Sequence, residues 1–244
     1  MNSSLAKQRC AYVRNLMDNP WFTVNQRGVT RYTAKEYGVD RWRLYQDGTV
    51  TVTSAGLTLS GAKDLGQPIE NDRIKTGRQL TFSVLMKDGS IHQKTFAVRG
   101  NQSETVFGKI GESTLTLNFI YDWGGSGKTL VALQGSGAIR ACKLEYGANS
   151  TLALDSVPEY ASELAKCQRY YQKYVLNCYT FYTGTSGEAA YVYLHTFPQM
   201  RIVPTVTYVG GGINAVDLVT KSSAQFKGPS AASYVSSIQL NADL

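Results

Sequence analysis

Apolar and polar residues alternate along most of residues 21–154, a pattern that predicts β-strands. In Thr49–Thr53, valine and threonine alternate, which gives a strand one apolar and one polar face. Leu80–Met86 and Ile91–Val98 flank Asp88-Gly89, a dipeptide typical of a β-hairpin turn. Further candidate strands are Leu57–Leu59, Ser113–Tyr121 and Gly135–Tyr146. Strands that recur about every 8–12 residues predict a sandwich or barrel, and the lack of helix–strand alternation argues against a parallel α/β sheet.

The period changes over residues 155–175, where we predict a linking helix. Ser156 would cap this helix, because Pro158 stands in its first turn and Glu159 follows Ser156 by three residues. Behind the cap, larger side chains recur at intervals of four and three residues, at Tyr160, Leu164, Cys167, Tyr171 and Tyr174. Such a stripe either packs on the chain's own β-domain or forms an oligomer interface, as in a trimeric fibre.

The two ends of the chain differ from each other. Residues 1–20 are predicted to be a separate attachment segment, with a short helix over Leu5–Met17 that ends before Pro20. Residues 176–244 return to strand patterns, at Ala189–Thr196, Thr205–Val209 and Val235–Leu240, with Gly210–Gly212 as a turn. A β-domain of about 70 residues has a thin core, which favours docking or self-association.

The charge distribution, the cysteines and the apolar runs argue against nucleic-acid binding, metal binding and membrane insertion. The net charge is +7, and residues 1–43 hold eight Lys and Arg against three acids. These bases are spread singly, so we expect solvated surface charge and no nucleic-acid partner. The four cysteines form no CxxC pair and the two histidines stand apart, so no metal site is predicted. No secretion signal and no apolar run of about 20 residues is present, which predicts cytoplasmic synthesis without membrane insertion.

The sequence contains no complete catalytic motif. Gly127-Lys128-Thr129 resembles the end of a phosphate-binding loop, but Asp122 stands where that motif needs glycine, and a strand pattern follows in place of a helix. His92 and His195 lie in predicted strands without a Gly-x-Ser-x-Gly elbow nearby. We therefore predict no catalytic residues, no cofactor and no enzymatic activity.

Aromatic residues carry the strongest binding signal. The chain has 16 Tyr against 8 Phe and 3 Trp, and tyrosine suits half-wet surfaces because its ring packs while its hydroxyl reaches water or a partner. Sugar sites combine an aromatic face with polar side chains that reach the hydroxyl groups. The predicted glycan-binding residues are Trp123, Asp122, Tyr37 and Arg41, whereas Trp42 is expected to anchor the core.

Five segments, in order along the chain, resemble phage and prophage tail-fibre or receptor-binding proteins. Asn15–Gly28 and Tyr37–Trp42 resemble the "NLL-N-x-F-x-x-NQRG" and "Y-x-x-DRW" segments with which such proteins open. Ala141–Gly147 resembles their "KLE-x-G" strand, Glu163–Tyr171 their "E-L-x-x-CQRYY" helix, and Phe197–Val206 their "FP-x-x-MR-x-x-PTV" segment. The chain departs from this pattern in one respect, because only about 20 residues precede the first β-domain where tail fibres carry a long attachment region.

The resemblance implies a mainly β protein. Its parts would be an N-terminal jelly-roll β-sandwich (21–154), similar to carbohydrate-binding modules, the linking helix, and a small C-terminal β-domain. It further implies a virion protein that contacts other tail or capsid proteins, recognises a host cell-surface glycan and forms a homotrimer. A head-fibre or capsid-decoration protein is the alternative, docked through its basic N-terminal segment, and a polysaccharide depolymerase is a further one.

Overall fold

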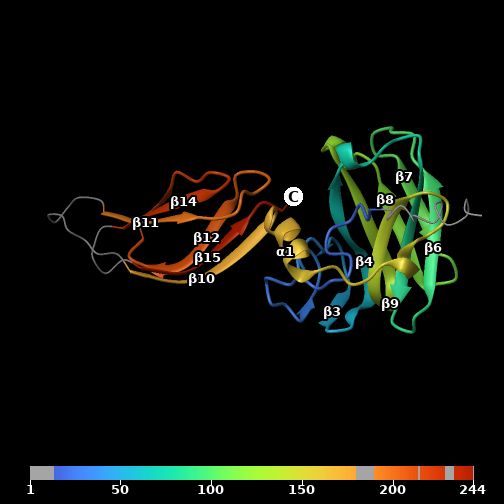
Figure 1. Cartoon of the computed structure of the whole chain (residues 1–244), viewed down its shortest axis with the longest axis horizontal. Coiled ribbons are helices and arrows are strands. Elements are labelled where there is room, and N and C mark those ends of the chain that lie inside the picture. The colour runs from blue at the N-terminus through green and yellow to red at the C-terminus, as the bar shows by residue number, and fades with distance from the viewer. Residues whose placement is uncertain (1–13, 180–189, 214, 229–233, 244) are drawn as a thin grey trace, which may run out of the picture. The chain divides into compact units, whose positions relative to one another are not determined.

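The computed structural model describes residues 14–179, 190–213, 215–228 and 234–243. The chain divides into two compact units, Met1–Glu159 and Tyr160–Leu244, and each is described by itself (Figure 1). Both units are built from antiparallel strands, so the predicted mainly β class is confirmed, together with a β-sandwich, a small helix and a C-terminal β region. No helix within the described residues is long and apolar enough to cross a membrane.

The first unit is one nine-stranded antiparallel sheet that folds over on itself. Its strands are β1 (Arg31–Tyr32), β2 (Arg43–Leu44), β3 (Thr49–Thr53), β4 (Gly56–Glu70), β5 (Gln79–Met86), β6 (Ile91–Ala97), β7 (Thr105–Lys109), β8 (Leu115–Ile120) and β9 (Lys128–Tyr146). The described part of this unit also contains the short 3-10 turns η2 (Asn71–Arg73), η3 (Trp123–Gly125) and η4 (Leu152–Leu154). The predicted hairpin appears as β5 and β6.

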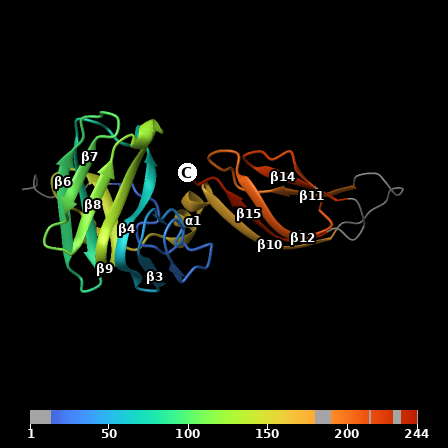
Figure 2. The same cartoon turned by 180° about the vertical axis from the view of Figure 1, so that it is seen from behind.

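The long strands β4 and β9 belong to both layers of the sandwich (Figure 2). The first half of β4 pairs with β3, and the second half of β9 pairs with β5, which continues to β6. The other halves of β4 and β9 pair with β2 and β8, and β8 continues to β7. Side chains of the two layers, such as Phe82 of β5 and Phe119 of β8, share one buried core, as the two sheets of a β-sandwich do.

Leu16 and Met17 belong to this core and residues 18–20 are buried as well, so the prediction that residues 1–20 form a separate segment is wrong for its last part. Leu16 is buried and its amide donates to the carbonyl of Leu144 on β9 at 2.8 Å. The Asn15 side-chain amide donates to the carbonyl of Cys142, and its oxygen accepts the Leu144 amide. Residues 14–17 form no helix, because their backbone pairs with β9 instead, and residues 1–13 lie outside the described part.

The helix α1 (Tyr160–Gln168) is shorter than predicted. Its last turn closes with the amide of Tyr170 donating to the carbonyl of Cys167, and β10 (Tyr171–Tyr179) begins at once. Tyr171 pairs with Asn241 of another strand. Pairing across a sheet therefore overrides the heptad-like spacing, and an aromatic run of this kind fits a strand equally well.

The second unit holds two three-stranded sheets, β10-β15-β12 and β11-β14-β13. The remaining strands are β11 (Ala190–Thr196), β12 (Thr205–Gly211), β13 (Ala215–Asp217), β14 (Ser223–Gly228) and β15 (Tyr234–Asn241). Phe226 of β14 and Ile238 of β15 lie in one small core between the sheets. Gly210 and Gly211 are part of β12, so the predicted turn is wrong there; a Cβ on Gly210 would lie 2.2 Å from the carbonyl oxygen of Tyr234.

Candidate functional site

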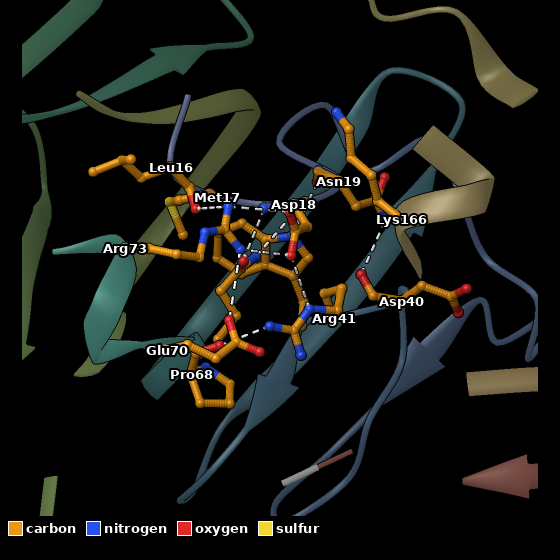
Figure 3. A network of polar contacts seen from close by, with 12 residues as sticks. Leu16, Met17, Asp18, Asn19, Asp40, Arg41, Pro68, Glu70, Arg73 and Lys166 are labelled. Carbon is orange, nitrogen blue, oxygen red and sulfur yellow. Dashed lines mark hydrogen bonds and ion pairs between the residues drawn. The ribbon is translucent and has the colours of Figure 1, made fainter. Parts of the chain in front are cut away.

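Arg41, predicted to contact a glycan, is instead buried in a network of charges inside the first unit (Figure 3). Its Nε lies 3.4 Å from Asp18 Oδ2, and its Nη2 donates to the carbonyl of Pro68 at 2.7 Å. Arg73 Nη1 lies 3.2 Å from the same Asp18 oxygen. Arg41 has a positive φ of 73°, so its side chain leaves the alternation that β2 begins and points inward. The prediction for Arg41 is therefore wrong, and its role is structural.

The outer face of the β2-β4-β9-β8-β7 layer follows from strand register, because directly opposed residues share a face. One row of opposed residues consists of Arg43, Gly66, Ala132, Asn118 and Phe107. The neighbouring row includes Leu44, Leu65, Leu133 and Leu117, all fully buried. The Arg43 row therefore faces away from the core, and Gly66 and Ala132 at its centre leave room for larger polar side chains beside them.

Asp64 of β4 organises three amide side chains on this outer face. Its Oδ1 accepts hydrogen bonds from Asn118 Nδ2 and Gln134 Nε2, each at 2.8 Å, and its Oδ2 accepts one from Gln46 Nε2 at 2.5 Å. The three amides come from β8, β9 and the segment after β2. Asp64 is buried, whereas Asn118 and Gln134 are half-buried and Gln46 is exposed. We call Gln46, Asn118 and Gln134 the amide cluster.

An aromatic row lies next to the amide cluster. The amide of Tyr45 donates to the carbonyl of Asp64 at 3.0 Å, and the ring of Tyr45 meets that of Trp123 edge-on, with 5.3 Å between centroids. The guanidinium of Arg43 lies over Tyr45 at 5.0 Å and over Tyr37 at 5.4 Å. Arg43 and Tyr45 flank the buried Leu44, so strand alternation sends both side chains outward. Predicted residues Trp123 and Tyr37 are thus linked through Tyr45 and Arg43.

Asp122, also predicted to contact a glycan, shapes the loop that presents Trp123. Its Oδ1 accepts hydrogen bonds from the Gly127 amide and from Asn71 Nδ2, each at 2.9 Å. The loop holds Trp123 with 38% of its surface exposed. The Gly-Lys-Thr sequence continues into β9 rather than a helix, so it lacks the helix N-terminus that a phosphate site uses.

The predicted oligomer-interface residues do not share one face. Tyr160 is exposed on α1, Leu164 is half-buried and Cys167 is buried. Tyr171 and Tyr174 stand on β10, where Tyr174 packs against the core of the second unit. A seam along a single helix is therefore not formed by these five residues.

Asp88, Ser90 and His92 come together at the β5–β6 turn. Ser90 Oγ donates to Asp88 Oδ1 at 2.7 Å and lies 3.1 Å from His92 Nε2. The hydrogen bonds from the Ser90 side chain and backbone hold the pKa of Asp88 below its ordinary value. A nucleophilic triad places histidine between serine and the acid, whereas here the acid binds the serine directly, as in an Asx turn.

The second unit has a candidate site of its own. A depression of about 220 Å³ on the second unit is lined by Thr207, Tyr208, Val209, Ser237 and Gln239, none of them charged. Among the described residues, no three His, Cys, Asp or Glu side chains gather as a metal site. The outer face of the first unit thus holds the richest chemistry in the described part of the chain.

Sequence reasoning identified Trp123 and Tyr37 but missed Asp64, Arg43 and the amide cluster. Asn118 stands at a polar position of the alternating run Ser113–Tyr121, and this was the signal in the sequence that could have identified it.

Comparison with protein-family models, with curated proteins and with solved structures finds no match for this chain.

Proposed function

We propose that the chain is a phage virion protein of the tail-fibre or receptor-binding class, and that its first unit binds a host cell-surface glycan. The virion assignment rests on the five sequence segments that resemble such proteins. The glycan assignment rests on one observation, the Trp123–Tyr45 ring pair set beside the amide cluster. Aromatic rings and amides together match the CH faces and hydroxyl groups of a sugar. In this proposal the second unit contributes to trimer assembly, which would raise avidity through multivalency.

Binding to arrayed host surface polysaccharides tests this proposal. Trp123→Ala should weaken binding about 5- to 150-fold, since the loss of a stacking aromatic costs on the order of 1–3 kcal/mol. Leu154→Ala is the matched control, because Leu154 is an exposed apolar residue of the same unit, and its substitution should leave binding unchanged. Absence of binding to any host polysaccharide would sink the glycan proposal.

Deletion of part of the N-terminal segment tests the alternative of a capsid-decoration protein, provided that residues 15–20 are kept. Residues 15–20 contribute to the core, so their removal would unfold the first unit. Deletion of residues 2–13 leaves those contacts in place. Loss of particle attachment in that variant, with glycan binding intact, would favour docking through the basic N-terminal segment. Three of the eight bases in residues 1–43 already make contacts with other residues of the first unit, at Arg27, Arg41 and Arg43.

A further inference from the structure

The amide cluster has a chemical preference that follows from how Asp64 orients it. A carboxylate accepts hydrogen bonds, so each of the three amides must turn its NH₂ group toward Asp64. The carbonyl oxygens of Gln46, Asn118 and Gln134 then point away from Asp64, and each NH₂ group keeps a second N–H. These amide oxygens accept no hydrogen bond from the described residues. Three oriented acceptors, each with a spare donor, therefore remain for a ligand.

We propose that Asp64 and the amide cluster form a subsite for an uncharged sugar residue, and that this subsite discriminates against acidic sugars. The inference rests on the proposed glycan binding and adds the ligand class and the residues. Sugar hydroxyl and acetamido groups both donate and accept, so they can pair with amide oxygens and with the spare N–H groups. Carboxylate and sulfate groups only accept, so they can pair with the spare N–H groups but not with the three carbonyl oxygens, and they would meet the negative charge of Asp64 behind the amides.

The guanidinium of Arg43 does not cancel the preference for uncharged sugars over acidic ones. The guanidinium of Arg43 lies between the rings of Tyr37 and Tyr45, and its Nη2 approaches the carbonyl of Lys35 at 3.5 Å. Arg43 is thus held along the aromatic row, whereas Asp64 lies directly beneath the amides. The charged group in direct hydrogen-bond contact with the amide cluster is therefore the carboxylate of Asp64.

The backbone at Asp64 explains how its side chain reaches the amide cluster. Asp64 has a positive φ of 61° and lies between Ala62 and Leu65, where the pairing of β4 with β9 shifts register. Bulges of this kind redirect a side chain, and aspartate adopts the left-handed backbone conformation more readily than most residues do. Asp64 acts through the amides, so it is a positioning residue rather than a ligand contact.

Glycan arrays that pair each neutral oligosaccharide with its uronic-acid or sulfated counterpart test the subsite with the full chain. The wild-type chain should bind the neutral members in preference to the acidic ones. Gln46→Ala and Gln134→Ala should each weaken neutral binding about 3- to 10-fold, the equivalent of one hydrogen bond between uncharged groups. Gln79→Ala, an exposed glutamine at the start of β5, is the matched control and should change nothing.

Asp64→Asn separates positioning from general damage. This substitution removes the charge and places an NH₂ group against the cluster, so neutral binding should fall while discrimination against the acidic partner narrows. Loss of structure alone would lower both affinities together and leave their ratio unchanged, a result that would overturn the role of Asp64. Melting temperature, measured alongside, identifies any variant that fails to fold.

The outcomes distinguish the two proposals. Binding of acidic members in preference to neutral ones, or neutral binding unaffected by Gln46→Ala and Gln134→Ala, would overturn the subsite while glycan binding stood. Absence of binding to every glycan and host polysaccharide would overturn both.

Discussion

The two β-units of this chain reach their folds by different means. In the first unit, strand β9 spans 19 residues and lies in both layers, and one core cluster draws on both. In the second unit, two separate three-stranded sheets share a much smaller cluster among the described residues. The polar groups of the candidate site stand on the long strands of the first unit or next to them. Precise recognition sites need rigid support, and the first unit supplies the larger support of the two.

Truncation of a core side chain in each unit should give the largest loss of unfolding free energy. It also tests whether the two units unfold separately. Trp42→Ala removes a fully buried ring that packs on Phe22 and donates from Nε1 to the carbonyl of Asn19 at 3.0 Å. It should cost about 3–5 kcal/mol of unfolding free energy. Phe226→Ala should cost a similar amount in the second unit.

Tryptophan fluorescence distinguishes the two units in a urea titration. All three tryptophans lie in the first unit, at Trp21, Trp42 and Trp123. Phe226→Ala should therefore shift the circular-dichroism transition and leave the fluorescence transition of the wild-type tryptophans in place. An equal shift in both signals would show that the two units unfold as one.

Arg41 and Arg43 offer a second contrast, between the interior and the outer face of the first unit. Arg41→Ala leaves Asp18 buried without its ion pair to Arg41 and should cost about 3–5 kcal/mol, as for other broken buried pairs. Arg43→Ala removes a half-buried cation stacked on two rings and should cost about 1 kcal/mol or less. Chemical denaturation measures both, and equal losses would contradict the assignment of Arg41 to the interior.

Gly66 tests how closely the two long strands approach each other. A Cβ on Gly66 would lie 2.4 Å from the Val131 carbonyl oxygen and 2.6 Å from the Ala132 Cβ. Gly66→Ala should cost about 1–3 kcal/mol, the usual range for overpacking. Thr58→Ala, at an exposed position of β4, is the control for thermal melting. A neutral Gly66→Ala variant would mean that β4 and β9 separate easily.

Alkaline pH should weaken the first unit gradually. Burial raises the pKa values of the Cys142 thiol and the Tyr32 hydroxyl. A raised folded-state pKa contributes stability below the unfolded value and loses it as pH rises, so the loss should begin near pH ~8.5 for Cys142 and near ~10 for Tyr32. The slope should reach about 1.4 kcal/mol per pH unit for each group. Cys142→Ala should abolish the loss of stability that begins at the lower pH. Chemical denaturation at a series of pH values measures this change.

Sequence patterns predicted the local elements well and the long-range contacts poorly. The alternation in Thr49–Thr53 predicted strand β3, and the Asp88-Gly89 turn predicted the β5–β6 hairpin, because both signals depend only on neighbouring residues. Arg41 was misassigned because its positive φ turns it inward, which no alternation pattern reveals. Asp64 was missed because the residues that give it a role come from β8, β9 and the segment after β2, and only strand register unites them. The predicted helix ran past the observed end of α1, because Tyr171 and Tyr174 pair with β15 as part of a strand despite their helical spacing.

The contact of Asn15 with β9 has a consequence for synthesis on the ribosome. The hydrogen bond from the Leu144 amide to Asn15 joins positions 129 residues apart. Leu16 and Met17 therefore cannot reach their final places until β9 has left the exit tunnel. Translation at about 5–20 residues per second leaves these apolar side chains without their partners for roughly 6–26 seconds. Chaperone capture of the nascent chain should be strongest in that interval and should fall once β9 emerges.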